Sequence, residues 1–432
     1  MKKVGIVSLG CMKNLVDSEN ILGLFDRNGY EITNDPRNAD IIVINTCGFI
    51  ESSKKESIEN ILEMIQYGKK VVVTGCLAER YLEDLRKEIP EVDLYIPIRE
   101  YSHFNEKLFV LDKDIDPAIG VDDGYRVVST GPYSAYLKIG EGCDNRCSYC
   151  AIPIIRGGFV SRDYDAIIKE AQDLADNGIK EVIVLEQDTT KYGIDFKDKK
   201  VNIVDLLYGL LAIKGLEYIR LLYLYPDEIT DELIELMGKE KRLTPYFDVP
   251  IQHSETHILK DMYRRGDKEF LINLFNKIRN KVPNAILRTT VMVGFPGESE
   301  EDVDRLIEFM NLVKFDHLGA FTYSQEEGTP AASFDNQIDE DIKKKRLARV
   351  MKAQQKISYS LNKKHVNEIM EGLVIGRDEH GNYLLRSYWN APDDVDGKIF
   401  FTSNRELHNG DDVRVKITGA FVYDLMGEEY EN

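Results

Sequence analysis

Short apolar runs rich in valine and isoleucine alternate with amphipathic segments in the N-terminal part of the chain. The runs are Val4 to Leu9, Ile41 to Asn45, Val71 to Thr74 and Leu94 to Ile98. The segments between them, such as Ser18 to Asn28 and Ser53 to Tyr67, place apolar residues at helical spacing. Strands that are apolar on both faces and alternate with helices pack into a parallel sheet with helices on each side. This part of the chain therefore predicts a doubly wound parallel sheet.

A second alternation of strands and helices begins at Ser134. The six strand candidates are Ala135 to Ile139, Glu181 to Leu185, Tyr218 to Leu224, Tyr246 to Ile251, Ile286 to Val293 and His317 to Tyr323. Helical periodicity separates them, for example at Tyr164 to Asn177, Thr230 to Lys239, Glu269 to Lys281 and Glu300 to Val313. Six such units predict a partial (β/α)6 barrel, in which functional residues gather at the carboxyl ends of the strands.

The pattern changes again toward the C-terminus, where the long helical stripe Asp339 to His365 is followed by five short alternating segments. These segments are Leu373 to Ile375, Tyr383 to Leu385, Lys398 to Phe401, Val413 to Ile417 and Ala420 to Tyr423. Short strands separated by turn residues predict a small antiparallel β-barrel of the OB-like kind. We therefore expect a multidomain α/β protein with domains at 1–118, 129–364 and 366–432, the first two joined by a linker rich in Asp, Gly and Pro.

The charge balance narrows the range of partners. The 432 residues include 75 acidic and 56 basic side chains, which give a formal net charge of -19. Nucleic-acid binding depends on clustered Lys and Arg, so this balance disfavours a general nucleic-acid binder and favours a basic partner. The stretch 368–432 has 14 acidic and 6 basic side chains and a net charge of -8. No apolar run approaches the roughly 18 residues of a membrane span, and we expect a cytoplasmic protein whose thiols stay reduced.

Three of the six cysteines lie together in GEGCDNRCSYCAIP, where Cys143, Cys147 and Cys150 have the spacing C-x3-C-x2-C. A 4Fe-4S cluster normally takes one thiolate on each iron, so three cysteines leave one iron open to a non-protein ligand. Zinc is the first alternative, but a closed structural zinc site needs a fourth ligand nearby. The nearest histidines, His103 and His253, are 40 and 103 residues away. Three buried structural thiols are a further alternative, disfavoured because one short loop cannot easily bury all three.

The other three cysteines, Cys11, Cys47 and Cys76, each end one of the first three apolar runs. They are separated by 36 and 29 residues, yet the carboxyl ends of parallel strands share one edge of a sheet. A single free cysteine is often only a core residue. Three cysteines at equivalent strand ends predict instead a second three-thiolate cluster.

The spacing C-x3-C-x2-C, with Tyr149 just before the last cysteine, resembles the signature of the radical S-adenosylmethionine (SAM) superfamily. In that superfamily SAM chelates the open iron and is cleaved to methionine and a 5'-deoxyadenosyl radical. Over nearly its whole length, the chain resembles the methylthiotransferase family. That family joins a three-cysteine domain, a radical-SAM barrel and a C-terminal barrel called TRAM.

Several motifs resemble the RimO type of this family, which modifies an aspartate of small-subunit ribosomal protein twelve, more than the MiaB type, which modifies an adenosine of tRNA. They are QDTTKYG (187–193), DVPIQHS (248–254), YSQEEGT (323–329) and APDDVDG (391–397). CSYCAIPIIRGGFVSR (147–162) fits both types, and Glu186 departs from the pattern of both. The acidic C-terminal barrel also favours the RimO type, because it suits a basic ribosomal protein and repels RNA.

The resemblance implies two 4Fe-4S clusters, SAM, a sulfur donor and an electron donor of the flavodoxin or ferredoxin type. All six cysteines would bind metal, with Cys143, Cys147 and Cys150 at the catalytic cluster. The implied SAM contacts are Tyr149, Gln187, Asp188, Gly294, Pro296, Gly297 and Glu298.

Some of these assignments leave alternatives open. The turn GFPGE (294–298) either offers backbone amides to a ligand carboxylate or is a plain turn. His253, at a strand end, is either structural or a substrate contact. We further expect Asp393, Asp394 and Asp396 to recruit the ribosomal protein, with tRNA disfavoured as a partner.

Overall fold

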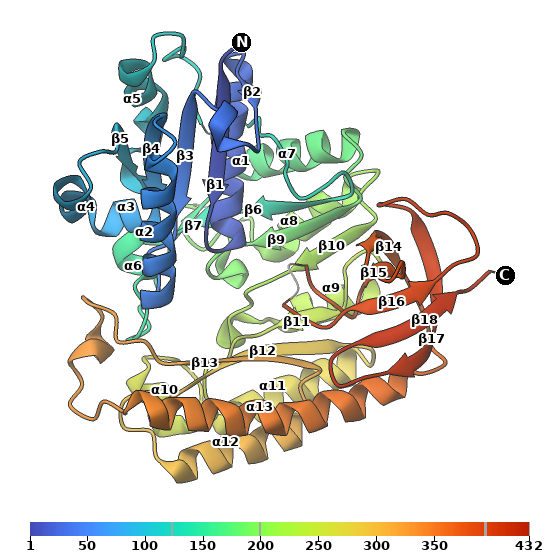
Figure 1. The fold of residues 1–432 in the computed structure, drawn as a ribbon. Helices are drawn as coiled ribbons and strands as arrows, with labels where there is room; N and C mark the ends of the chain where they lie inside the picture. Colours follow the sequence, from blue (N-terminus) through green and yellow to red (C-terminus); the bar gives the residue numbers. More distant parts are fainter. Residues whose placement is uncertain (122–123, 198–199, 393–394, 432) are drawn as a thin grey trace.

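Three sheet systems follow one another along the chain in the computed structural model, which describes residues 1–121, 124–197, 200–392 and 395–431 (Figure 1). Each system falls within one of the three predicted domain ranges, whose limits stay a prediction. Among the helices that the structure describes, none is both long and apolar enough to cross a membrane.

The N-terminal sheet is parallel and five-stranded, with the order β2-β1-β3-β4-β5. Its strands are β1 (Lys3–Ser8), β2 (Glu31–Ile32), β3 (Ile41–Thr46), β4 (Lys70–Gly75) and β5 (Leu94–Pro97). Its helices are α1 (Met12–Arg27), α2 (Glu51–Ile65), α3 (Cys76–Arg80), α4 (Leu82–Glu88) and α5 (Phe104–Leu111). Val43 packs with α1 and α5 on one face, whereas Ile44 packs with α2 and α4 on the other. The predicted doubly wound sheet is confirmed; β2 is too short to show a sequence pattern.

The central strands form the predicted partial barrel from two parallel three-stranded sheets, which are joined by a bridge between Ile219 and Leu243. Its strands are β6 (Ser134–Lys138), β9 (Glu181–Leu185), β10 (Tyr218–Leu221), β11 (Tyr246–Asp248), β12 (Ile286–Val293) and β13 (His317–Thr322). Its helices are α7 (Tyr164–Asp176), α8 (Ile203–Ala212), α9 (Asp231–Lys239), α10 (Thr256–Asp261), α11 (Lys268–Lys281), α12 (Glu300–Val313) and α13 (Glu340–Asn362). The loop after β6 carries the short elements β7 (Gly140–Glu141), α6 (Ile152–Ile155) and β8 (Val160–Ser161). Helix α8, whose sequence IVDLLYGLLA is apolar nearly all round, completes the unit that follows β9.

The C-terminal strands close into a barrel with the order β14-β15-β16-β18-β17. They are β14 (Ile369–Arg377), β15 (Tyr383–Ser387), β16 (Ile399–Thr402), β17 (Asp412–Ala420) and β18 (Leu425–Glu429). Four pairings are antiparallel and one, β16 with β18, is parallel. The predicted strand Ala420 to Tyr423 is wrong, because Phe421 N–H donates to Asp424 O (2.8 Å) in a turn. The sequence of the real last strand, LMGEE, shows no apolar alternation, because its buried positions are Leu425 and Gly427 and its exposed positions include both Met426 and Glu428.

The C-terminal barrel packs against the interior of the partial barrel (Figure 1). Trp389, which is fully buried, shares one apolar cluster with Tyr136, Ile183 and Tyr246 of the central strands. Arg220 of β10 donates to Ser387 O at 2.7 Å. These contacts fix the C-terminal barrel to the partial barrel.

The proposed docking role of Asp396 is wrong, because its side chain is only 1% exposed. It accepts hydrogen bonds from the Tyr246 hydroxyl (2.6 Å) and from Ala391 N–H (2.8 Å). Burial acts to raise the pKa of this carboxyl, but His317 and Arg288 outweigh it and hold the pKa below its usual value. Asp396 therefore joins two domains and offers no surface to a partner. Asp393 and Asp394 lie outside the described residues.

Candidate active site

The N-terminal cysteines lie at the ends of three adjacent strands. Cys11 follows β1, Cys47 follows β3 and Cys76 begins α3 directly after β4. From β1 the chain connects to β2 on one side, and the next strand, β3, lies on the other side of β1, so the boundary between β1 and β3 is a topological switch point. Ligands of open parallel sheets bind in the crevice at such a point. The predicted convergence of Cys11, Cys47 and Cys76 on one sheet edge is therefore present in the structure.

Close backbone packing holds the three cysteine loops together. Gly10 has a φ of +90°, and a Cβ added there would lie 2.9 Å from Cys47 Cβ. A Cβ on Gly48 would lie 2.8 Å from Leu77 Cα, in α3 directly after Cys76. Larger residues at these two glycines would push the cysteine loops apart, so Gly10 and Gly48 are required for the geometry of the triplet.

Two polar side chains lock the same loops. Asn14, in α1, donates its Nδ2 to Leu9 O (2.7 Å) and to Thr46 O (3.1 Å), which joins the ends of β1 and β3. The Ser57 hydroxyl accepts from Cys47 N–H at 3.0 Å and donates to Cys47 O at 2.9 Å. The positions of the cysteines are thus set before any metal binds.

The second triplet, Cys143, Cys147 and Cys150, occupies the loop after β6 and is tied to other strand-end loops. Cys143 N–H donates to Gly157 O (3.1 Å), and Ser148 N–H donates to Met262 O (3.0 Å). Arg264, in the loop between α10 and α11, lies 3.9 Å from the Cys147 sulfur through its Nη1. The loop is therefore held at the end of the barrel where active sites form.

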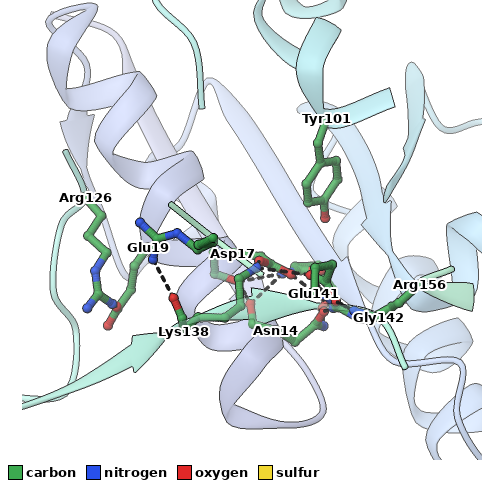
Figure 2. A network of polar contacts seen from close by, with 12 residues as sticks. Asn14, Asp17, Glu19, Tyr101, Arg126, Lys138, Glu141, Gly142 and Arg156 are labelled. Carbon is green, nitrogen blue, oxygen red and sulfur yellow. Dashed lines mark hydrogen bonds and ion pairs between the residues drawn. The ribbon is translucent and has the colours of Figure 1, made fainter. Parts of the chain in front are cut away.

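The two triplets are neighbours. Cys76 packs in one small buried cluster with Ala151 and Ile155, which directly follow Cys150 along the chain. Figure 2 shows the polar network beside this contact, in which Arg156 reaches from the barrel loop to α1 of the N-terminal domain. The chain thus brings both sets of thiols to one interface between domains.

A buried ion cluster fixes the same interface from another side. Glu326, in the loop after β13, accepts from Arg80 Nη1 at 2.9 Å and from Lys54 Nζ at 3.0 Å. Arg80 also donates to Gly48 O at 3.0 Å, next to Cys47. The side chains of Arg80 and Glu326 are 4% and 3% exposed, so solvent screens their pairing little. We call Glu326, Arg80 and Lys54 the interdomain clamp.

Burial governs the protonation of the thiols. Burial raises the pKa of Cys76 and of Cys143 to about 11, and that of Cys150 to about 12. Without metal these groups stay protonated at neutral pH, and a metal must displace the protons on binding. Three thiols at the ends of adjacent strands and three in one loop are the donor sets that two three-thiolate clusters need.

No three of the His, Cys, Asp and Glu side chains that the structure describes surround a single point in the way that one metal ion requires. A cubane makes a different demand, because each of its thiolates binds a separate iron.

Three of the predicted SAM contacts lie beside the barrel triplet. The Tyr149 hydroxyl is 3.4 Å from Arg264 Nη1. Asp188 is fully buried and accepts from Asn145 Nδ2 at 2.7 Å, which ties the end of β9 to the cysteine loop. Gln187 Nε2 donates to Glu141 Oε1 at 3.1 Å. These three residues shape the cysteine loop, and their contacts with SAM stay a prediction.

Three backbone amides of the GFPGE turn already donate hydrogen bonds to acceptors within the protein. Gly294 N–H donates to Glu298 Oε1 (2.8 Å), Gly297 N–H to Asn336 O (3.0 Å) and Glu298 N–H to Phe295 O (3.0 Å). Pro296 has no amide hydrogen. The geometry favours the plain turn over the amide nest, and SAM contacts at Gly294, Pro296, Gly297 and Glu298 stay a prediction.

His253 is fully buried beside this turn. Its Nδ1 accepts from Glu255 N–H at 3.0 Å, and its Nε2 lies 3.4 Å from Glu298 Oε2. These contacts match the structural alternative.

Glu186 lies at the end of β9 and is fully buried. Neither carboxyl oxygen has a hydrogen-bond partner among the described residues. Burial and the nearby Glu141 raise the pKa of Glu186 well above its usual value, against the opposing effect of Lys13. The site therefore favours the protonated form of Glu186.

Sequence reasoning missed Asn14, Arg156, Arg264 and the interdomain clamp. Arg156 and Glu326 stand within motifs that carry the family resemblance, CSYCAIPIIRGGFVSR and YSQEEGT, but nothing in either motif names the residue they contact. No sequence pattern indicated that Arg264 contacts the cysteine loop, because it lies 117 residues from Cys147.

Three family models match the chain in succession. They are the Uncharacterized protein family UPF0004 at residues 3–97, the Radical SAM superfamily at 137–310 and the TRAM domain at 367–429. The first and third matches cover all strands of the N-terminal and C-terminal sheet systems, and the second spans the central strands β9 to β12.

Curated relatives match the chain over nearly its full length. A protein of Caldicellulosiruptor saccharolyticus named ribosomal protein uS12 methylthiotransferase RimO is 47% identical, over 99% of this chain and 100% of its own. Proteins of the same name from Alkaliphilus oremlandii and Clostridioides difficile are 46% and 45% identical, each over 99% of both chains.

Solved structures share the fold at low sequence identity. The radical SAM methyltransferase TsrM from Kitasatospora setae has a TM-score of 0.57 at 13% identity and covers 89% of this chain and 87% of its own. The cobalamin-dependent SAM radical enzyme OxsB has a TM-score of 0.53 at 12% identity and covers 81% of this chain and 56% of its own.

Proposed function

The chain belongs to the RimO family of radical SAM methylthiotransferases, and from this premise we propose that it methylthiolates the β-carbon of an aspartate in ribosomal protein uS12. The family uses 4Fe-4S clusters and SAM. We assign the catalytic cluster to Cys143, Cys147 and Cys150, and an auxiliary cluster that carries the sulfur to Cys11, Cys47 and Cys76.

One observation supports this assignment above the others, namely the packing of Cys76 against Ala151 and Ile155. A transfer that joins a radical at one cluster to a sulfur at another needs the two sites close together in a fixed orientation. The interdomain clamp and the Arg156 network hold that orientation without help from a ligand.

The clusters and SAM, when bound, supply the radical chemistry that no side chain provides. The protein's own residues hold and enclose the reactants. Arg264 places a cation 3.9 Å from the Cys147 sulfur, where it stabilises the negative charge of a ligating thiolate. Asp188 and Asn145 fix the loop between Cys143 and Cys147. The C-terminal barrel closes the interior of the partial barrel through Trp389, which excludes water from that side.

Charge supports a basic protein as the partner. Exposed acids remain on the C-terminal barrel although Asp396 is buried; they include Glu371, Glu379, Glu406, Asp412 and Glu428. Such a surface attracts a cationic ribosomal protein and repels tRNA. We further propose a cytoplasmic location, an added sulfur donor and an electron donor of the flavodoxin or ferredoxin type.

The test is mass spectrometry of purified uS12 after incubation with the anaerobically reconstituted enzyme, SAM, sulfide and reductant. We expect one aspartate to gain the mass of a methylthio group that replaces one hydrogen. A parallel reaction with tRNA is the control. Methylthiolated adenosine together with unmodified uS12 would contradict the proposal.

A second expected result concerns metal content. Anaerobic reconstitution should load about eight irons per chain, on four per cubane. Replacing Cys11, Cys47 and Cys76 by alanine should lower this to about four, as measured by iron and sulfide analysis. Eight irons in that variant would show that these three cysteines are not the auxiliary ligands.

A further inference from the structure

Arg156 physically links the two cysteine triplets. It follows α6, six residues after Cys150, and its side chain is 1% exposed. Its Nη2 lies 3.6 Å from the Cys76 sulfur, although Cys76 belongs to the other triplet. One side chain therefore extends from the loop of the catalytic cysteines to a ligand of the proposed auxiliary cluster.

The guanidinium is held in place from several sides (Figure 2). Nη2 donates to Asn14 Oδ1 at 2.8 Å and to Asp17 Oδ2 at 3.0 Å, and Nη1 donates to Glu141 Oε2 at 2.7 Å. A planar fork fixed by several acceptors has little freedom to turn away. The contact with the Cys76 sulfur is thus part of a rigid network.

The charges around Arg156 define its electrostatic effect. Lys138 pairs with both Asp17 and Glu141, so two cations face two carboxylates before any thiolate is counted. A thiolate at Cys76 brings additional negative charge directly against Arg156. In the low dielectric of a buried site this attraction is strong.

We propose that Arg156 is a positioning residue that raises the reduction potential of the cluster held by Cys11, Cys47 and Cys76, through its guanidinium contact with the Cys76 sulfur. The inference rests on the proposed function, because it requires that this triplet carries a cluster. Hydrogen bonds to ligating sulfurs and net charge nearby set the potential of such clusters. A cation stabilises the reduced form, which carries one more negative charge, and so makes reduction easier.

The test isolates the auxiliary cluster in the full chain. The parent protein carries Cys143→Ala, Cys147→Ala and Cys150→Ala, so that only Cys11, Cys47 and Cys76 bind iron. Into it we introduce Arg156→Met, Arg156→Lys or the control Arg126→Met. Arg126 is a matched control because it is buried in the same interface and pairs with Glu19 and Glu170 instead of a thiol.

The measurements are iron content and the midpoint potential from a reductive titration followed by electron paramagnetic resonance. We expect about four irons in each protein and a more negative potential in Arg156→Met than in the parent. Arg156→Lys keeps the positive charge but loses the planar guanidinium, so its midpoint potential should also become more negative, by less than in Arg156→Met. Arg126→Met should shift the potential less than Arg156→Met does.

Each contrary result has a separate meaning. A parent that binds no iron would overturn the proposed auxiliary site itself. A loaded Arg156→Met protein with the parent's potential, or with the same shift as Arg126→Met, would overturn the role of Arg156 and leave the proposed function standing. If Arg156→Met binds no iron, the proposal is judged by the midpoint potential of Arg156→Lys, which must be more negative than that of the parent. If neither variant binds iron while the parent does, Arg156 is required for cluster assembly and the proposal is wrong.

Discussion

Replacing Cys143, Cys147 and Cys150 by alanine is expected to abolish the reductive cleavage of SAM. Only this triplet lies in the loop after β6, at the catalytic end of the partial barrel. Without it, no open iron is present to bind SAM there, and side-chain acid or base catalysis cannot replace that chemistry. The measurement is release of 5'-deoxyadenosine under reducing conditions.

The matched variant replaces Cys11, Cys47 and Cys76 by alanine. We expect it to retain SAM cleavage and to lose methylthiolation of uS12, because these cysteines lie at the edge of the N-terminal sheet and, in the proposed assignment, hold the sulfur-carrying cluster. Parallel assays of 5'-deoxyadenosine and modified uS12 separate the two steps. Equal loss of cleavage in both triple variants would contradict the division of roles.

The architecture follows from patterns that a sequence displays directly. The run Ile41 to Ile44 is apolar at successive positions, and the structure buries it on both faces of a parallel sheet. Parallel strands that end in cysteine must place those residues on one edge, so the convergence of Cys11, Cys47 and Cys76 needed no coordinates. These features depend only on periodicity and chain direction.

The contacts that join the domains could not be predicted in this way. Arg156 and Cys76 are 80 residues apart, and Arg80 and Glu326 are 246 apart. No periodicity relates such positions, and each contact depends on how two finished domains dock. The predicted docking role of Asp396 was wrong for the same reason. An acid in a polar segment resembles a surface residue, and only the tertiary packing against Tyr246 shows that it is buried.

The interdomain clamp is the other place where one substitution should have a large effect. Glu326 holds two cations, Arg80 and Lys54, of which Arg80 is 4% exposed. Burial acts to raise the pKa of Glu326, but hydrogen bonds from Ser324, Lys54 and Arg80 outweigh it and lower the pKa. A lowered pKa means that the clamp stabilises the fold fully at neutral pH and loses strength only as the pH falls through that lowered value.

Glu326→Gln should therefore leave Arg80 buried and uncompensated, at a cost of about 3 to 5 kcal/mol when one partner of a buried pair is removed. Arg80 also contacts Gly48 beside Cys47, so the auxiliary triplet should shift relative to the barrel. A displacement of about 1 Å can reduce a reaction on the order of 100-fold. We expect the ratio of modified uS12 to cleaved SAM to fall by about that factor, with cleavage itself reduced far less.

The control is Glu327→Gln, an identical change at the next residue. The Glu327 side chain is exposed, and the residue contacts Arg80 through its backbone oxygen. An unchanged ratio in a folded, iron-loaded Glu326→Gln protein would show that the clamp does not align the two sites.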